Sequence, residues 1–534
     1  MLILQHLTYF HPNKDLLFEN LDLTIRGRNK MALVGKNGIG KSTLLKIMAG
    51  ELQPSSGTVT SSSLPYYIPQ LFGQFDQYSI GSALRVDGKL RALREITEGH
   101  VTNENLANLD EDWTIEERCR EALAYWDLDG LDLGSPIGKL SGGQKTKVFL
   151  AGIAIHQPEI ALLDEPSNHL DLSARRLLYD FFKTSKCTML VVSHDRKLLD
   201  LPDTVVELDK NGLTTYGGNY SFYRAQKQME KNAFDHELRA KEKELRKAKE
   251  TARETAEKQQ RHNARGKKKQ EKAGMPTILI NSMRNSAENS TARLKGIHAE
   301  KVGAVSDALN ELRKELPDLD KMKFGFDNST LHKGKILVSA KGVNFGYGTR
   351  LLWDNPIDFQ VLSGERIALK GNNGSGKTTL IRMITGDIEP VSGSIQRAID
   401  KTVYIDQDYS IVDNNITVFE QVGRFNHSRL QEHELKSRLN RFLFTKEDWD
   451  KAGVSLSGGE KMRLTLCCLT ISEHAPDIII LDEPTNNLDI QNMEILTAAI
   501  NEYMGTLIVV SHDEHFLESV RTVRSIDLNS MGSC

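Results

Sequence analysis

The stretch Gly35-Lys-Asn-Gly-Ile-Gly-Lys41-Ser42 decides the fold of this 534-residue chain. Glycines at this spacing let backbone N–H groups converge on phosphate oxygens at the start of a helix, and the lysine adds positive charge there. The apolar run at residues 30–34 predicts a buried strand before the loop, and the run after Ser42 predicts a helix. A strand, a glycine-rich loop and a helix in this order indicate an α/β fold with a mainly parallel sheet.

The same loop occurs a second time, as Gly371-Asn-Asn-Gly-Ser-Gly-Lys377-Thr378, and three further motifs recur in the same order. These are Leu140-Ser-Gly-Gly-Gln144 with Leu456-Ser-Gly-Gly-Glu460, the Leu-Asp-Glu-Pro runs ending at Pro166 and Pro484, and the Val-Val-Ser-His-Asp runs ending at Asp195 and Asp513. His194 follows Asp164 by 30 residues, and His512 follows Asp482 by 30 residues. The chain therefore contains a duplicated module.

The repeat predicts three segments. The modules are expected at residues 1–224 and 334–534, with a linker at 225–333 between them. From Gln70 to Ser141 there are 71 residues, whereas the matching interval from Gln407 to Ser457 has 50, so the first copy carries an insertion of about 21 residues. Further apolar runs in each module predict parallel strands that are buried on both faces. They lie at residues 161–163, 189–192, 478–481 and 507–510.

The composition excludes several classes of protein. The net charge of −3 and the 26% of charged residues are ordinary for a globular chain. The five cysteines are scattered and form neither a disulfide framework nor a zinc motif, which indicates a reduced compartment. No apolar run approaches the ~18 residues of a membrane-spanning helix, and the first residues lack the pattern of a signal peptide. We expect a cytoplasmic protein without membrane insertion.

Both glycine-rich loops predict an ATP site that uses Mg²⁺. The lysine of each loop is expected to reach the β- and γ-phosphates, and the hydroxyl after it to bind the metal ion. The residues of the first loop predicted to bind ATP are Gly35, Lys36, Asn37, Gly38, Ile39, Gly40, Lys41, Ser42 and Thr43. Those of the second loop are Gly371, Asn372, Asn373, Gly374, Ser375, Gly376, Lys377, Thr378 and Thr379.

Other residues of each module fit the chemistry of hydrolysis. A carboxylate at the end of an apolar strand suits Mg²⁺, and the glutamate after it can polarise the attacking water as a general base. A glutamine can touch metal and water, and a histidine can donate to the γ-phosphate. The predicted metal ligands are Ser42, Thr378, Gln70, Gln407, Asp164 and Asp482. The predicted catalytic residues are Glu165, Glu483, His194, His512, Gln70 and Gln407.

The Leu-Ser-Gly-Gly motifs predict a second anion-binding nest at the start of a helix. An ordinary serine N-cap is the simpler alternative for each motif, but its combination with a phosphate loop favours nucleotide binding. The residues concerned are Ser141, Gly142, Gly143 and Gln144 in the first module, and Ser457, Gly458, Gly459 and Glu460 in the second.

The linker is expected to be a basic helical hairpin. Residues 224–274 contain 17 lysines and arginines against 9 acidic residues. Gly274-Met-Pro276 would end the first helix, the second is expected to begin near Ala292, and the tip would then lie at residues 274–288. Two apolar seams suit the contact between the helices. They consist of Leu238, Leu245 and Ala252 in the first helix, and of Val305, Leu309, Leu312 and Leu316 in the second.

A dense basic run lies beside the predicted tip. Six basic residues and one acidic residue fall between Arg261 and Lys272, a pattern that suits RNA phosphates. A solvated helix face is the alternative, and it is the better interpretation for residues 224–260. The predicted RNA contacts are Arg261, Arg265, Lys267, Lys268, Lys269 and Lys272.

With these motifs the chain resembles the ATP-binding-cassette (ABC) ATPases across both modules. In that family two cassettes face each other head to tail, so the resemblance implies that residues 35–42 pair with 457–459 and residues 371–378 with 141–143. Two ATP molecules would be sandwiched inside one chain, a monomer with an intramolecular cassette dimer. The resemblance also implies that the adenine stacks on an aromatic residue upstream of each loop. The candidates are Tyr347 in the second module, and Tyr9 or Phe10 in the first.

Within the superfamily the chain is similar to the F subfamily of twin-cassette translation factors. Pro166-Ser-Asn-His-Leu-Asp171 and Pro484-Thr-Asn-Asn-Leu-Asp489 are close to that subfamily's Pro-Thr-Asn-His-Leu-Asp, and the basic linker also fits. The resemblance implies a ribosome partner (rRNA and tRNA), with the linker beside the exit-site tRNA and directed toward the peptidyl-transferase centre. The protein would regulate translation, rescue stalling or protect from antibiotics. The insertion falls where some members carry an arm.

Two other functions fit part of the sequence. The chain could be the ATPase subunit of a transporter that docks on separate membrane subunits, but the basic hairpin argues against this. A DNA-associated cassette ATPase would also explain the basic linker. The sequence contains neither the zinc cysteines nor the very long coiled coil expected for that class.

Overall fold

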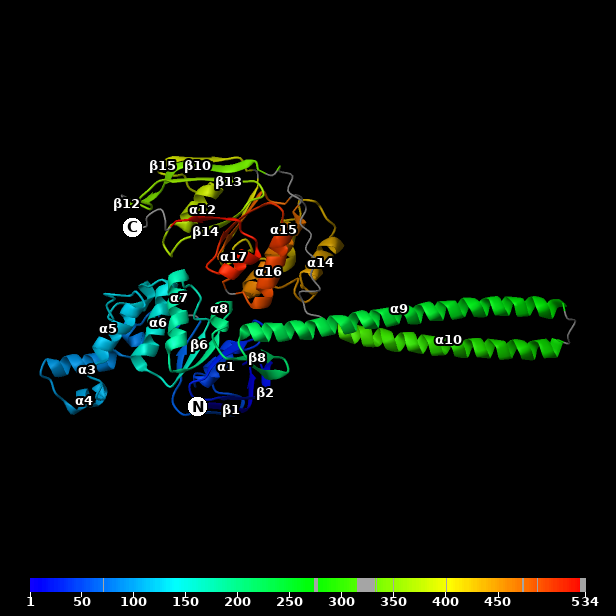
Figure 1. The fold of residues 1–534 in the computed structure, drawn as a ribbon, viewed down its shortest axis with the longest axis horizontal. Coiled ribbons are helices and arrows are strands. Elements are labelled where there is room, and N and C mark those ends of the chain that lie inside the picture. The colour runs from blue at the N-terminus through cyan, green and yellow to red at the C-terminus, as the bar shows by residue number, and fades with distance from the viewer. Residues whose placement is uncertain are drawn as a thin grey trace. The chain divides into compact units, whose positions relative to one another are not determined.

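The computed structural model describes residues 1–70, 72–272, 277–314, 332, 334–348, 350–399, 401–472, 475–486 and 488–528. The chain divides into two compact units, one formed by Met1–Tyr223 with Met322–Cys534 and the other by Arg224–Lys321. The first unit contains both modules and the second contains the linker, as the colours of Figure 1 indicate.

The first module is built on a six-stranded sheet of order β5-β6-β7-β3-β8-β9. All neighbouring strands in it are parallel except β8 and β9, and a separate antiparallel sheet has the order β2-β1-β4. The strands are β1 (Leu2–Phe10), β2 (Leu16–Ile25), β3 (Lys30–Val34), β4 (Ser56–Ser61), β5 (Tyr66–Ile68), β6 (Ile160–Asp164), β7 (Thr188–Val192), β8 (Thr204–Asp209) and β9 (Gly212–Gly217).

The main sheet lies between two layers, because its strands are apolar on both faces. Ala32 and Val34 of β3 belong to one hydrophobic cluster, while Met31 and Leu33 belong to the other, as the two-residue period of a strand requires. The helices are α1 (Lys41–Met48), α2 (Ile80–Ala83), α3 (Asp87–Thr97), α4 (Asn103–Leu109), α5 (Ile115–Tyr125), α6 (Gly142–His156), α7 (Leu172–Thr184) and α8 (Arg196–Leu199), with short 3₁₀ turns at Gly73–Phe75 and Ile137–Lys139.

The second module repeats this plan. Its main sheet has the order β16-β17-β18-β14-β19 with all neighbours parallel, beside an antiparallel sheet β13-β10-β15 and the pair β11-β12. The strands are β10 (Ile336–Asn344), β11 (Gly346–Tyr347), β12 (Arg350–Leu351), β13 (Ile357–Leu362), β14 (Arg366–Lys370), β15 (Ser392–Arg397), β16 (Thr402–Ile405), β17 (Ile478–Asp482), β18 (Thr506–Val510) and β19 (Arg524–Asp527). The helices are α12 (Lys377–Thr385), α13 (Val418–Arg424), α14 (Glu432–Arg441), α15 (Gly458–Ile471), α16 (Ile490–Glu502) and α17 (Glu514–Ser519), with a 3₁₀ turn at Gly453–Ser455. The predicted α/β class with mainly parallel sheets is confirmed.

The insertion of the first module contains the helix pair α3 and α4. Ala92 of α3 and Leu109 of α4 are both buried in the core of the first module. The Nδ2 of Asn105 also donates to Glu95 at 2.8 Å, which ties α4 to α3. The matching interval of the second module, between Gln407 and Ser457, contains α13 and α14.

The second unit contains two long helices, α9 (Tyr220–Lys272), which begins in the first unit, and α10 (Thr277–Lys314). The predicted seams are confirmed where the structure describes them. Leu238, Leu245 and Ala252 are half-buried along α9, and Val305 and Leu309 of α10 are buried. Leu312 is half-buried, and Leu316 lies outside the described residues. An ion pair of 2.8 Å between Arg313 and Glu242 joins the two helices, which we call the linker hairpin.

The predicted start of the second linker helix near Ala292 is wrong. The helix α10 begins at Thr277, so residues 277–288 of the predicted tip are helical backbone, while residues 274–276, the predicted helix break, lie outside the described residues. The reason is local. No glycine or proline follows Pro276 before Gly296, so a helix that starts after the proline propagates at little cost per residue.

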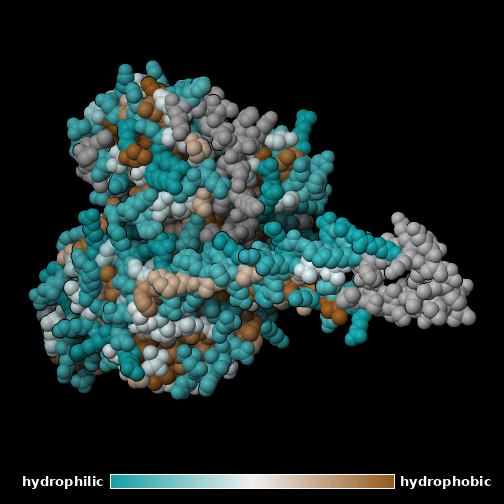
Figure 2. Space-filling view, turned by 45° about the vertical axis from the view of Figure 1, so that its right-hand side comes forward, coloured by the Kyte–Doolittle hydropathy of each residue, from teal (hydrophilic) through white to brown (hydrophobic). Residues whose placement is uncertain are grey.

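The face of the molecule drawn in Figure 2 is mostly hydrophilic. Figure 2 shows scattered apolar side chains on a polar face, in keeping with cores buried inside each module. Among the described residues, none of the helices has the length and apolar character needed to cross a membrane.

The buried seam predicts how the linker hairpin is stabilised. Leu309 is 2% exposed, so Leu309→Ala should weaken the hairpin by about 2–5 kcal/mol through lost packing and a residual cavity. Hydrogen exchange of the α9 and α10 amides measures this. Ile297→Ala is the matched control, because Ile297 lies on the same helix and is 54% exposed. Equal exchange rates in the two variants would show that the seam does not hold the hairpin together.

Candidate active site

Each glycine-rich loop wraps a space at the start of a helix. The helices α1 and α12 begin directly after Gly40 and Gly376, which have left-handed backbones with φ of 105° and 93°. A Cβ at Gly40 would lie 2.9 Å from Leu17, and one at Gly376 would lie 2.5 Å from Leu352. Only glycine combines this conformation with this close approach, so the glycine spacing fixes the loop shape.

The lysine of each loop folds back over the loop. The Nζ of Lys41 donates to the carbonyls of Gly35 at 2.7 Å and Lys36 at 3.0 Å. Lys377 repeats both distances toward Gly371 and Asn372. Burial lowers the pKa of each lysine, and Glu165 opposes this at Lys41 as Glu483 does at Lys377. A positive charge therefore lies where backbone N–H groups converge, which is a binding position for phosphate.

Carboxylates at the ends of β6 and β17 meet these loops. Asp164 is 2% exposed and accepts hydrogen bonds from Ser42 and, at 3.3 Å, from the hydroxyl of Tyr67. Asp482 accepts from Thr378 and, at 2.9 Å, from Tyr404. The structure thus brings each predicted hydroxyl ligand together with its predicted carboxylate. The tyrosines were not predicted, although each stands three residues before the glutamine of its module.

The glutamates after these aspartates are held in an unusual environment. Glu165 and Glu483 have φ of 52° and 48°, a conformation that is uncommon for residues other than glycine and is often found at functional sites. Burial raises the pKa of Glu165 to about 8 and that of Glu483 to about 7. Asp164 adds to the rise at Glu165, while Lys41 opposes it. A carboxylate with such a pKa is suited to exchange a proton near neutral pH.

The histidines face the same glutamates. The backbone N–H of His194 donates to Oε2 of Glu165 at 3.2 Å, and that of His512 donates to Oε2 of Glu483 at 3.4 Å. The ring Nε2 atoms lie 3.2 and 3.4 Å from the respective Oε1 atoms. Burial, reinforced by the lysine charge, lowers the pKa of His194 to about 3 and of His512 to about 4. Both rings are therefore neutral and able to donate one hydrogen bond.

The clusters fit Mg²⁺ and a nucleotide. Within the described part of the chain, Oδ1 of Asp164, Oε1 of Glu165 and Oε1 of Glu483 are buried without a hydrogen-bond partner. A buried oxygen without a partner costs free energy that a bound ion or water recovers. When bound, Mg²⁺ neutralises charge on the phosphates. The residues placed to hold it are Ser42 and Asp164 with Gln70 nearby, and Thr378 and Asp482 with Gln407 nearby.

Two cavities correspond to the two sites. The first site has about 390 Å³ and is lined by the first loop, Gln70, Asp164, Glu165 and His194. The second site has about 530 Å³ and is lined by the second loop, Gln407, Asp482, Glu483 and His512. Ser141, Gly142 and Gly143 of the first module also line the second site, as the head-to-tail arrangement requires.

The first site is less complete. Within the described residues, its lining does not include Ser457, Gly458 or Gly459. The second module reaches it instead through Asp489, whose carboxylate accepts from the backbone N–H of Asn37 at 3.0 Å. Thus, within the described residues, the second glycine-rich loop shares a cavity with the Leu-Ser-Gly-Gly motif of the first module, whereas the first loop does not share one with the motif of the second module.

Both Leu-Ser-Gly-Gly motifs also form ordinary helix caps. Ser141 is the N-cap of α6, and its hydroxyl accepts from the backbone N–H of Gln144 at 3.3 Å. Ser457 is the N-cap of α15, and its hydroxyl accepts from the backbone N–H of Glu460 at 3.4 Å. The side chains of Gln144 and Glu460 complete capping boxes, so these two residues serve the helix rather than lining either cavity within the described structure.

Of the aromatic residues predicted to stack on adenine, Tyr347 lines its cavity, whereas the described lining of the first cavity includes neither Tyr9 nor Phe10. Tyr347 lines the second site, is 65% exposed, and its hydroxyl lies 3.1 Å from that of Thr379. In the first module Tyr9 packs against Phe18 and His11. Phe10 is 45% exposed, and it is not among the described residues that line the first site. His11 and Leu17 line that cavity instead. The stacking role of Tyr9 or Phe10 stays a prediction, and His11 is a cavity residue that the sequence did not indicate.

The predicted RNA contacts are placed in part. Arg261 and Arg265 are exposed on α9, whereas the side chains of Lys267, Lys268, Lys269 and Lys272 are outside the described structure. Among the described residues, no cluster of three or more histidine, cysteine or acidic side chains could hold another metal ion.

Two phosphate loops, two strand-end carboxylate pairs and one shared cavity define a P-loop nucleoside triphosphatase with two sites. A family model described as "ABC transporter" matches residues 18–168 and 355–486. The chain belongs to this ATP-binding-cassette family and is an ATP hydrolase. The resemblance to its F subfamily is confirmed by a relative from Arabidopsis thaliana, "ABC transporter F family member 5", which is 29% identical over 93% of this chain and 70% of its own length.

Bacterial relatives match over nearly the whole chain. The putative ATP-binding protein YdiF of Bacillus subtilis is 30% identical over 97% of this chain and 78% of its own. The probable ATP-binding protein YbiT of Escherichia coli O157:H7 is 29% identical over 98% and 95%. Among solved structures, "RNase-L Inhibitor" has a TM-score of 0.59 at 20% identity and covers 97% of this chain and 87% of that one. An archaeal ribosome recycling factor in complex with a ribosomal stalk protein has a TM-score of 0.56 at 21% identity, covering 98% and 87%. These two structures share the fold.

The glutamates should carry the hydrolytic step. The variant E165Q/E483Q removes both proposed bases while keeping shape, so kcat for ATP should fall about 10²–10⁴-fold with nucleotide binding retained. Phosphate release and binding of a fluorescent ATP analogue measure the two quantities. The control E19Q/E104Q changes two exposed glutamates. A rate within threefold of wild type would contradict the assignment.

The raised pKa values also predict a pH-dependent stability in the absence of nucleotide. The folded protein keeps protons on Glu165 and Glu483 up to about pH 8 and pH 7, whereas the unfolded chain loses them near 4.5. This part of the stability is complete below pH 4.5 and is lost as pH rises through 7 to 8. Glutamine does not titrate, so E165Q/E483Q does not lose this stability as pH rises. The melting temperature of the variant minus that of wild type should therefore increase between pH 5 and pH 8.5. A constant difference, as expected for E19Q/E104Q, would refute the raised pKa values.

Proposed function

We propose that the protein binds two ATP molecules with Mg²⁺ at the first and second sites and uses them to act on the ribosome. In each site the loop holds the phosphates, the hydroxyl and the aspartate hold the metal ion, and the glutamate activates water. The three proposed segments are residues 1–224, 225–333 and 334–534, working as a monomer in the cytoplasm, where ribosomes are found.

Closure of the two modules on ATP is the proposed mechanical step. Support comes from the second site, which the first module completes with Ser141, Gly142 and Gly143. A γ-phosphate held by both modules makes contacts that exist only when they are together, so ATP favours the closed state and hydrolysis releases it. The first site would gain Ser457, Gly458 and Gly459 on closure.

The linker hairpin is proposed to be the part that meets RNA. The observation that carries this is the exposure of Arg261 and Arg265 near the end of α9, within a run of six basic residues. Lysine and arginine on an exposed helix neutralise phosphates and release counterions. The resemblance to the F subfamily of the ABC family supports a ribosomal partner. The archaeal protein of the same fold is named as a ribosome recycling factor.

The finer proposal is that the hairpin lies beside the exit-site tRNA and points toward the peptidyl-transferase centre. There it would regulate translation, rescue stalled ribosomes or protect them from antibiotics. The relatives at about 30% identity are named only as ATP-binding proteins or family members, so this placement rests on the basic hairpin and on the resemblance.

Ribosome cosedimentation at several salt concentrations tests the proposal. The variant E165Q/E483Q with ATP should stay on ribosomes, and adding R261A/R265A should weaken binding and flatten the slope of log affinity against log salt by about 2. The control R246A/K249A removes the same charge from exposed positions of α9 that are predicted to be solvated. Equal slopes for the two double variants would remove the RNA contact, and ATP-dependent recruitment to membranes instead would favour a transporter subunit.

A further inference from the structure

The two modules differ at one position next to their ATP sites. Asp171 caps α7 by accepting from Ala174 at 3.0 Å, and Asp489 caps α16 in the same way by accepting from Asn492 at 2.7 Å. Four residues after these aspartates the first module has Arg175, whereas the second has Met493. Both side chains are buried, with exposures of 9% and 5%. A buried arginine in only one copy of a duplicated site is a difference in charge, not in packing volume.

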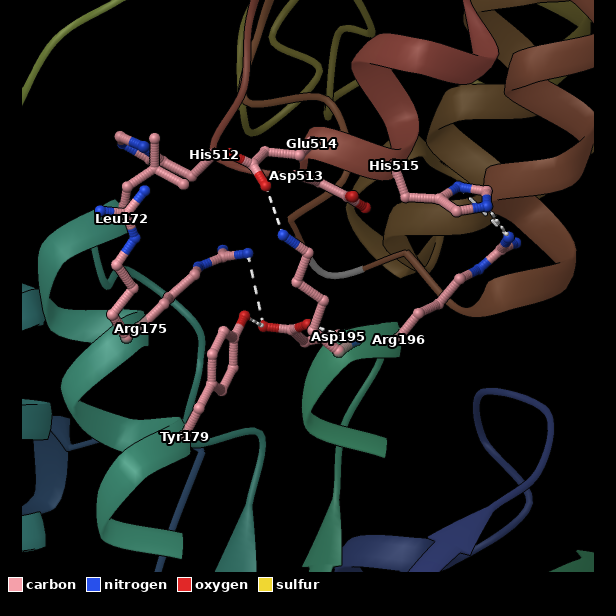
Figure 3. Close-up of a pocket in the computed structure, with 11 residues that line it drawn as sticks. Leu172, Arg175, Tyr179, Asp195, Arg196, His512, Asp513, Glu514 and His515 are labelled. Atoms are coloured by element: carbon pink, nitrogen blue, oxygen red, sulfur yellow. Dashed lines mark hydrogen bonds and ion pairs between the residues drawn. The ribbon is translucent and has the colours of Figure 1, made fainter. Parts of the chain in front are cut away.

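Within its own module, Arg175 holds two loops. Its Nε donates to the carbonyl of Leu170 at 3.1 Å, directly before the capping Asp171. Its Nη1 lies 3.7 Å from Oδ2 of Asp195, which also accepts from the hydroxyl of Tyr179. Figure 3 shows Arg175, Tyr179 and Asp195 grouped on the side of the first module. Asp195 is the residue after His194, so Arg175 contacts the loop that supplies the histidine of the first site.

Arg175 also belongs to the second site. It lines that cavity together with Lys377, Glu483 and His512. Within the described residues, the lining of the first site contains no residue of α16, the helix that carries Met493.

Contacts around Asp195 tie the same loop to the second module. Arg196 lies 2.9 Å from Nε2 of His515 and 3.6 Å from Glu494, and Lys197 pairs with Glu514. Figure 3 shows Arg196 facing His515 across the boundary between the modules. The loop after β7 therefore contacts Arg175, and the start of α8 directly after it contacts α16 and α17.

We propose that Arg175 is a positioning residue that links the two ATP sites in one direction, from the His194–Asp195 loop of the first site to Glu483 of the second. The proposal rests on the assignment of the two sites given above. When nucleotide at the first site moves this loop, Arg175 moves with Asp195 and changes the surroundings of Glu483. At the matching position the second module has Met493, which carries no charge, and its contact with the first site is made by Asp489 to the backbone N–H of Asn37. Coupling of binding must be reciprocal, but coupling of kcat need not be. Turnover at the second site should therefore depend more strongly on Arg175 than turnover at the first site.

Two backgrounds isolate the sites. In E165Q only the second site can hydrolyse ATP, and in E483Q only the first. Adding R175M, which copies the residue of the second module, should lower kcat about tenfold in E165Q, with KM within twofold. In E483Q it should lower the rate by no more than about threefold, because there Arg175 acts only through its contact with the loop that supplies His194. Arg175→Lys keeps the charge and should recover at least half of the loss. The matched control is R176M, because Arg176 is the neighbouring arginine and is exposed.

The outcomes separate the possible failures. Two results would show a general structural role for Arg175 and overturn the link. One is an equal loss of kcat on adding R175M to E165Q and to E483Q. The other is a melting temperature that R175M and Arg175→Lys lower to the same extent. No difference between R175M and R176M in E165Q would overturn it as well. If E165Q and E483Q each kept the full wild-type rate, the assignment of the sites would fail first, and the link with it.

Discussion

The burial of negative charge at the ends of β6 and β17 is the constraint on which both sites depend. Asp164 is the last residue of a strand that is buried on both faces, and Glu165 follows it, so water cannot solvate these carboxylates as it does at a surface. The ammonium of Lys41 offsets part of this cost, and the shape of the glycine-rich loop keeps it in place. What remains are carboxylate oxygens without partners, which a metal ion and a nucleotide would satisfy.

Duplication turns this local constraint into a relation between two halves of one chain. Each module supplies a loop and a carboxylate pair, and the second cavity is completed by Ser141, Gly142 and Gly143 of the first. The copies are not identical, because His11 lines the first cavity whereas Tyr347 lines the second, and Arg175 stands where the second module has Met493. A chain with two unlike sites can separate the binding of one nucleotide from the hydrolysis of the other.

The class of fold and most residues of each site could be predicted from the sequence, because they depend on short motifs and apolar runs. Short apolar runs define strands buried on both faces, and glycine spacing defines the loops. What it missed depends on tertiary structure. His11 lines the first cavity only because β1 and β2 bring it there, and Tyr67 and Tyr404 reach the aspartates across neighbouring strands. Arg175 looks like a helix-surface residue in the sequence, yet it is buried and lines a cavity together with residues of the second module. Thr277 starts a helix because neither glycine nor proline follows it before Gly296.

The distance between the modules, measured by electron spin resonance, tests the account most directly. Labels at V101C and V523C use exposed positions in the first and second modules, in an E165Q/E483Q chain with Cys187 and Cys534 replaced. The account predicts that ATP with Mg²⁺ converts a broad distance distribution into a narrower one with a different mean, and that ADP does not. An unchanged distribution with two ATP molecules bound would contradict the claim that nucleotide brings the modules together.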